Sequence, residues 1–95
     1  MPEMRFQIEW PDGKQETCYS PSLVIKDHLT PGETYPLDDF VARCGEALAI
    51  ASERVRQKYG FPCSLAQGEA ARIRRTAASF QGRPGAAVRV LAFFE

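Results

Sequence analysis

The chain has 95 residues, of which twelve are basic and twelve acidic, so its formal net charge at neutral pH is zero. This length predicts a single domain, residues 1–95, with one core and no large enclosed ligand cavity. The balanced charge argues against nucleic acid as a partner, because nucleic-acid binding usually needs a strongly basic face. No apolar run approaches the ~20 residues of a membrane span, so we expect a soluble protein with no membrane partner.

Residues 4–10 alternate apolar and polar side chains, which is typical of a half-buried strand. The following Pro11-Asp12-Gly13 suits a tight turn, and residues 14–19 return as the second strand of a hairpin. Pro21 ends that strand because it has no N–H for the ladder. Residues 22–29 fit either one helical turn capped by Ser22 or an extended segment.

A long amphipathic helix is predicted from Pro36 to Tyr59, where apolar side chains recur every three or four residues. Gly60 then suits the left-handed position that commonly follows a helix. A second helix is expected to begin at Ser64, which forms a capping-box pattern with Gln67.

Residues 86–94 predict the last strand, which is apolar on both faces except at Arg89 and therefore suits a central place in a sheet. The order β-β-α-α-β predicts an α+β fold. We expect a two-layer sandwich with two helices on one face of a three-stranded, mainly antiparallel sheet. The uncovered face would expose Leu91 and Phe93, which favours a homodimer or a covering partner protein.

The odd number of cysteines points away from a disulfide framework, and their spacing does not match a zinc motif. The first four residues have neither the charged region nor the apolar region of a secretory signal. Both features predict a reducing, cytoplasmic location.

Two short blocks place thiols and hydroxyls where regular structure should break, residues 18–22 and 59–64. Cys63 stands just before the second helix, where free N–H groups favour a thiolate, so it is a candidate catalytic nucleophile with Cys18 as its partner. Each cysteine could instead serve as a small buried apolar residue. The candidate binding residues are the other polar members of these blocks: Tyr19, Ser20, Ser22 and Ser64.

His28 is the only histidine, and it could act as a base for Cys63 or join Cys18 and Cys63 as a metal ligand. A solvated histidine before a turn is the simpler interpretation. Zinc requires four protein ligands, or three and a water molecule, and Cys18, Cys63 and His28 supply only three. We therefore expect no metal and no cofactor.

Six blocks lie along nearly the whole chain, beginning at Met1, Trp10, Cys18, Tyr35, Ala51 and Tyr59, the last continuing to Cys63-Ser64. Taken in order, they resemble a family of small bacterial nitrogen-starvation-response proteins. The resemblance implies a setting in the nitrilase gene cluster, linked with nitrogen assimilation from cyanide and nitriles. The neighbours it implies include a nitrilase, a radical-SAM protein, an acetyltransferase-like protein, an AIR-synthase-like protein and a flavin-dependent oxidoreductase. It implies no activity and no site residues.

Three hypotheses for function follow. The first is a non-catalytic accessory or interaction protein of a bacterial nitrile or cyanide nitrogen-assimilation pathway, dimeric or bound to another protein of that pathway. The second is a small thiol-dependent enzyme or carrier that uses Cys63 with Cys18. The third is a metal-binding sensor through Cys18, Cys63 and His28. Small size and the lack of a catalytic constellation favour the first.

Overall fold

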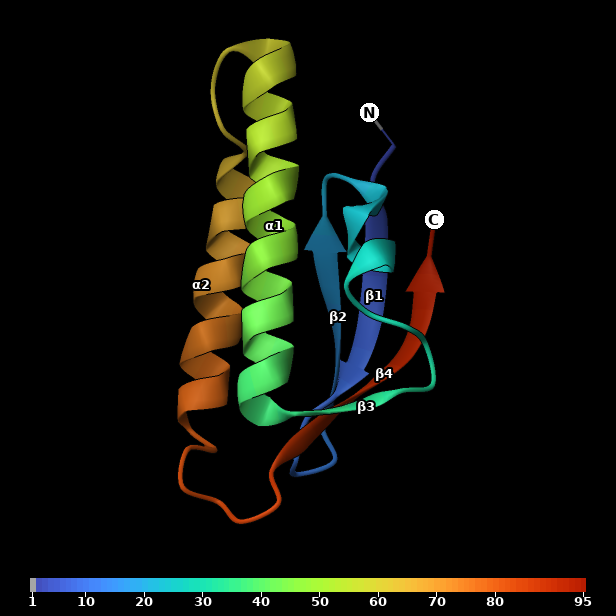
Figure 1. The fold of residues 1–95 in the computed structure, drawn as a ribbon, viewed down its shortest axis with the longest axis vertical. Helices are drawn as coiled ribbons and strands as arrows, with labels where there is room; N and C mark the ends of the chain where they lie inside the picture. The colour runs from blue at the N-terminus through green and yellow to red at the C-terminus, as the bar shows by residue number, and fades with distance from the viewer. Residues whose placement is uncertain (1) are drawn as a thin grey trace.

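The computed structural model describes residues 2–95, which form one sheet, a short 3-10 helix and two α-helices (Figure 1). The two long helices lie side by side over one face of the sheet, so the predicted α+β class is confirmed. The elements in chain order are β1 (Met4–Glu9), β2 (Gln15–Ser20), η1 (Leu23–Asp27), β3 (Thr34–Pro36), α1 (Leu37–Tyr59), α2 (Ser64–Ala78) and β4 (Ala87–Phe94).

The sheet has four strands in the order β2-β1-β4-β3, with every neighbouring pair antiparallel. The prediction of three strands is therefore wrong, because it lacks β3. This strand is only three residues long and includes a proline, so its sequence has no alternating pattern that would predict a strand. Its place at the edge of the sheet tolerates Pro36, and its pairing puts β4 inside the sheet, as predicted.

The predicted hairpin is confirmed, with Phe6 opposite Cys18 in the β1–β2 pair. At its turn the Gly13 N–H donates to the Trp10 carbonyl at 2.9 Å, and Trp10 N–H donates to the Lys14 carbonyl at 2.8 Å. Gly13 has a φ of 88°, a conformation that glycine adopts without a steric penalty. The local turn chemistry thus brings the two strands together.

The end of α1 at Tyr59 and the start of α2 at Ser64 agree with the sequence prediction, but the capping of α2 differs. Gly60 has a φ of 88°, and its N–H donates to the Arg56 carbonyl, so it ends α1 as predicted. The capping box at α2 is wrong: Cys63 is the N-cap, no side chain caps the helix, and Ser64 is its first residue. The Cys63 N–H instead donates to the hydroxyl of Ser52 in α1 at 3.2 Å, a tertiary contact that anchors the N-cap residue. Ser22 does cap a helical turn, η1, by accepting the Val24 N–H.

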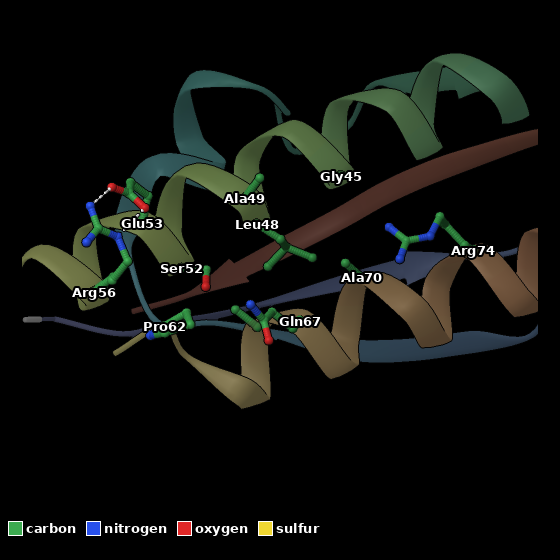
Figure 2. Close-up of a pocket in the computed structure, with 11 residues that line it drawn as sticks. Gly45, Leu48, Ala49, Ser52, Glu53, Arg56, Pro62, Gln67, Ala70 and Arg74 are labelled. Atoms are coloured by element: carbon green, nitrogen blue, oxygen red, sulfur yellow. Dashed lines mark hydrogen bonds and ion pairs between the residues drawn. The ribbon is translucent and has the colours of Figure 1, made fainter. Parts of the chain in front are cut away.

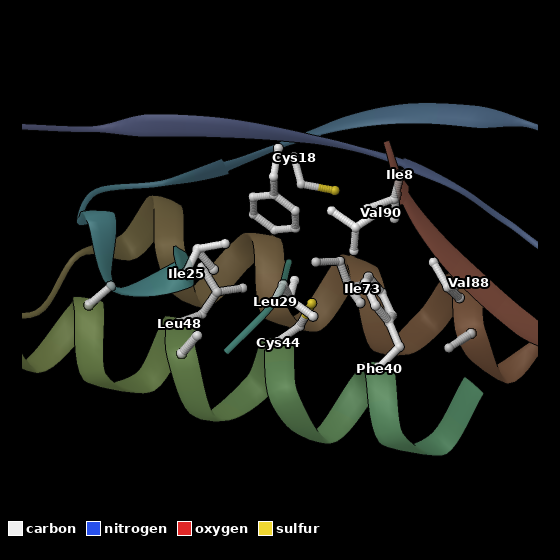
Figure 3. Packing of buried hydrophobic residues seen from close by; sticks show 14 of the residues in the cluster. Ile8, Cys18, Ile25, Leu29, Phe40, Cys44, Leu48, Ile73, Val88 and Val90 are labelled. Carbon is white, nitrogen blue, oxygen red and sulfur yellow. The ribbon is translucent and has the colours of Figure 1, made fainter. Parts of the chain in front are cut away.

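The core lies between the sheet and the helix pair (Figure 3). Ile8 of β1 faces Phe40 of α1 and Ile73 of α2 (Figure 3), and Phe6 of β1 is buried in the same cluster. Cys18 and Cys44 are buried in the same cluster as small apolar residues. This continuous apolar layer holds the helices against one face of the sheet.

The expectation that Phe93 would be exposed on the uncovered sheet face is also wrong, and Leu91 is half-buried rather than exposed. The β1–β4 register shifts between Gln7 and Ile8, which pair with Ala92 and Val90. The extra residue, Leu91, reverses the side-chain alternation, so Phe93 packs against the core and Phe94 becomes exposed. The uncovered face is mainly polar, which removes the sheet-face argument for a homodimer.

Candidate binding site at the tip of the helical hairpin

The two sequence blocks meet in space, where the end of β2 lies beside the connection between α1 and α2. Tyr19 borders two hollows there, of about 210 and 450 Å³. Glu3 lines both, Cys63 lines the smaller and Ser64 the larger. We call this region the Tyr19 site. It consists of Glu3, Arg5, Tyr19, Pro21, Val55, Tyr59, Cys63, Ser64, Leu65, Gly68 and Glu69.

Tyr19 is held by contacts from three directions. Its backbone N–H, on the free edge of β2, donates to Oε2 of Glu69 at 2.8 Å. The Arg5 guanidinium lies over its ring, 5.6 Å from the centroid. Burial and a hydrogen bond with the Glu3 carboxylate raise the pKa of the phenol above its ordinary value. A phenol is protonated at neutral pH even at its ordinary pKa of about 10, so Tyr19 can act as a hydrogen-bond donor in the site.

Cys63 is half-buried at the start of α2, where it lines the smaller hollow. As the N-cap residue it lies at the positive end of the helix dipole, as the sequence predicted. Ser64, exposed and without a capping role, lines the larger hollow. Cys63 and Ser64, from residues 59–64, therefore line the same site as Tyr19, from residues 18–22.

Cys18 lies in a different environment, on the core side of β2 with its sulfur 3.7 Å from Nη2 of Arg72. Burial raises the pKa of the Cys18 thiol well above its ordinary value, and the nearby Glu69 carboxylate and Cys44 thiol raise it further. Cys18 does not line either hollow of the Tyr19 site. A protonated, buried thiol is a poor nucleophile, so Cys63 is the better placed of the two.

We expect iodoacetamide to modify Cys63 in the native protein while Cys18 and Cys44 stay unmodified. Burial keeps both core thiols away from the reagent, and their raised pKa values keep them protonated at about pH 8. Mass spectrometry after brief treatment checks this, with protein unfolded in concentrated urea as the control in which all three react. Early modification of Cys18 would show that the β2–α2 contact opens readily.

Ser20 and Ser22 are buried and use their hydroxyls within the chain. The Ser20 hydroxyl donates to the Ser22 carbonyl at 2.7 Å. The Ser22 hydroxyl accepts from Val24 N–H and from Nη1 of Arg54. They shape the turn after β2 and do not line the hollows around Tyr19.

His28 lies away from the Tyr19 site, against α1. Its Nδ1 is 3.2 Å from the Val24 carbonyl, and its Nε2 is 3.9 Å from Glu46. Within residues 2–95, no group of three or more His, Cys, Asp or Glu side chains is arranged to hold a metal ion. The structure therefore does not bring His28, Cys18 and Cys63 together as a ligand set.

Three large exposed apolar side chains lie within seven residues of the chain at the end of the helical hairpin, and two of them, Tyr59 and Leu65, also line the Tyr19 site. Tyr59, Phe61 and Leu65 are 54%, 67% and 65% exposed. We call these three residues the apolar tip. In the sequence, this segment stands out for its thiol, whereas Leu65 and the charged Glu3, Arg5 and Glu69 do not stand out. The available signal was an aromatic residue on each side of Gly60, where the chain leaves a helix.

A network of charges fastens α2 to β2 beneath the site. Arg72 of α2 forms ion pairs with Glu16 of β2 and Glu69 of α2. Glu16 also accepts a hydrogen bond from Trp10 Nε1 at 2.6 Å. Since Glu69 holds the Tyr19 N–H as well, the network connects the core to the rim of the Tyr19 site.

Fold and site together define a small α+β protein with an open, apolar-rimmed surface at one end of a helical hairpin. No helix in the part of the chain that the structure describes is long and apolar enough to cross a membrane. The family model described as "Nitrogen starvation-induced protein NitG" matches residues 5–93, and the chain belongs to that family. This confirms the resemblance seen in the sequence blocks. Neither a curated protein nor a solved structure matches the chain.

Proposed function

We propose that this chain is a non-catalytic accessory protein of the bacterial nitrogen-starvation response, which acts in the cytoplasm by binding a protein partner through the apolar tip and the Tyr19 site. The observation that carries the proposal is the exposure of Tyr59, Phe61 and Leu65 together beside two hollows. Exposed apolar clusters with a polar rim are typical of protein interfaces, and tyrosine is enriched among the residues that dominate binding energy.

The local contacts support binding more than catalysis. The hydroxyls of Ser20 and Ser22 are engaged within the chain, and His28 lies against α1. Within residues 2–95 no base is hydrogen-bonded to the Cys63 sulfur. Nucleophilic catalysis usually places such a base within hydrogen-bond reach of the nucleophile.

We further propose that the pathway is nitrogen assimilation from nitriles or cyanide, which the resemblance of the sequence blocks to proteins of the nitrilase gene cluster implies. The partner is then either a second copy of this chain or another protein of that pathway. Light scattering coupled to size-exclusion chromatography distinguishes the two, because only a homodimer doubles the mass of the purified chain.

Replacing Tyr59, Phe61 and Leu65 with serine is expected to weaken partner binding by about tenfold or more, because truncating interface hot spots commonly costs over 1 kcal/mol each. The fold should persist, since all three side chains are more than half exposed. The measurement is capture of proteins from nitrogen-starved cells of the source bacterium, together with the mass of the purified chain.

The matched control is Phe94→Ser, which removes an equally exposed aromatic side chain at the end of β4, outside the Tyr19 site. The proposal would be contradicted if the wild-type chain is strictly monomeric and also captures the same proteins as the triple variant does.

The position of Cys63 favours a second candidate, a thiol-dependent activity at the same site. Cys63 is the N-cap of α2 and lines the smaller hollow with Tyr19. An alkylation rate at Cys63 that stays constant from about pH 8 down to about pH 6 would favour this candidate, because only a thiolate reacts rapidly.

A further inference from the structure

The outer side of the helix pair carries a groove of about 440 Å³ between α1 and the first three turns of α2 (Figure 2). It lies apart from the Tyr19 site, because the connection before α2 separates them. Pro62 lines the groove, whereas Cys63 lines the smaller hollow beside Tyr19. Along α1 the groove runs from Gly45 to Arg56, a length of about 16 Å.

Small side chains on both helices form the groove. Gly45 and Ala49 are four residues apart on α1, and Ala66 and Ala70 are four residues apart on α2. Residues at this spacing lie on one side of a helix, so the two pairs make a continuous shallow trough. A trough three helical turns long and open along one side fits a row of side chains from another helix better than a small molecule, which it could not enclose.

The charges at the two ends of the groove differ. Arg56 is bound by Glu53 through two hydrogen bonds, so that end is neutral (Figure 2). Arg74, at the other end, is exposed and forms no ion pair with any carboxylate of residues 2–95; the same holds for its neighbour Arg75. The unpaired positive charge at one end selects an occupant with negative charge at the corresponding position.

We propose that this groove binds an amphipathic helix of the partner protein, with small or medium apolar side chains in the trough and acidic residues beside Arg74. This inference rests on the proposed function and specifies the kind of partner segment that binds, an amphipathic helix with acidic residues at one end. The groove begins beside the apolar tip, since Arg56 and Pro62 flank Tyr59 and Phe61 in the chain. A bound helix could therefore extend from the tip along the groove.

The test uses two synthetic helical peptides of about 16 residues with the same apolar face, one flanked by glutamate and the other by lysine. Amide chemical shifts of the isotope-labelled protein report where each peptide binds. We expect the acidic peptide to shift Gly45, Ala49, Ala70 and Arg74, and the basic peptide to bind at least fivefold more weakly. Arg74→Glu should weaken the acidic peptide roughly five- to tenfold and improve binding of the basic one.

Arg83→Glu is the matched control, because Arg83 is also exposed and lines a different hollow. Equal binding of both peptides, no shifts along the groove, or no effect of Arg74→Glu would overturn the inference. Self-association through the groove, seen as the same shifts on raising protein concentration alone, would also overturn it. Loss of partner capture in the apolar-tip variant but not in Arg74→Glu would leave the proposed function standing and remove this inference alone.

Discussion

Replacing Arg72 with glutamine is expected to lower the free energy of unfolding by about 2–3 kcal/mol. Arg72 donates to both carboxylate oxygens of Glu69 at 3.0 Å and pairs with Glu16. The carboxylate side chains are only 24% and 20% exposed, so the variant would leave two poorly solvated negative charges without a counter-ion. Breaking a fully buried pair costs about 3–5 kcal/mol, and the partial exposure of Arg72 reduces that figure.

Urea unfolding at about pH 7 measures this loss, with Arg74→Gln as the matched control. Arg74 lies two residues further along α2, is exposed and forms no ion pair with residues 2–95, so its replacement should change stability by less than about 0.5 kcal/mol. Equal effects of the two variants would show that the network contributes little.

The second expected result is a steep loss of stability in alkaline solution. Burial raises the pKa values of Cys18 and Cys44 in the folded protein above those of the unfolded chain. Above about pH 8.5 the unfolded chain releases these two protons while the folded protein keeps them. The unfolded state then binds fewer protons, so the free energy of unfolding falls as pH rises. Each thiol contributes about 1.4 kcal/mol per pH unit, or about 2.7 kcal/mol for the pair.

Urea unfolding in a reducing buffer between about pH 8 and pH 10 measures this slope. Cys44→Ala removes one of the two buried thiols, so the variant should lose only about half as much stability over the same interval. Cys44 forms no hydrogen bond through its sulfur within residues 2–95, which makes it a cleaner substitution than Cys18. A slope that is the same in the variant and the wild type would show that Cys44 ionises equally in both states.

The sequence predicted some residues of the Tyr19 site but not others. The blocks that contain Tyr19, Cys63 and Ser64 stand out as sequence, and the structure brings these three residues together. Glu69 and Arg5 do not stand out in the sequence. Charged residues are common on helix and strand surfaces, and the sequence does not show which residue each of them contacts in the fold. Glu69 lies fifty residues from Tyr19 in the chain, and only the packing of α2 against the edge of β2 places its carboxylate on the Tyr19 N–H.

The sequence by itself determined those features whose causes are local. The Pro11-Asp12-Gly13 turn, the apolar periodicity of α1 and the glycine that ends it each act through a few neighbouring residues, and all were predicted correctly. The ordered blocks likewise identified the family.

Only the tertiary structure decided β3, the bulge at Leu91 and which residue is the N-cap of α2. The short β3 exists because β4 offers it a pairing edge, and the bulge reverses which of Phe93 and Phe94 faces the core. The N-cap at Cys63 depends on the hydroxyl of Ser52 in another helix. In each case the deciding contact joins segments distant in sequence, and the free energy of that contact outweighs the local preference of the residues involved.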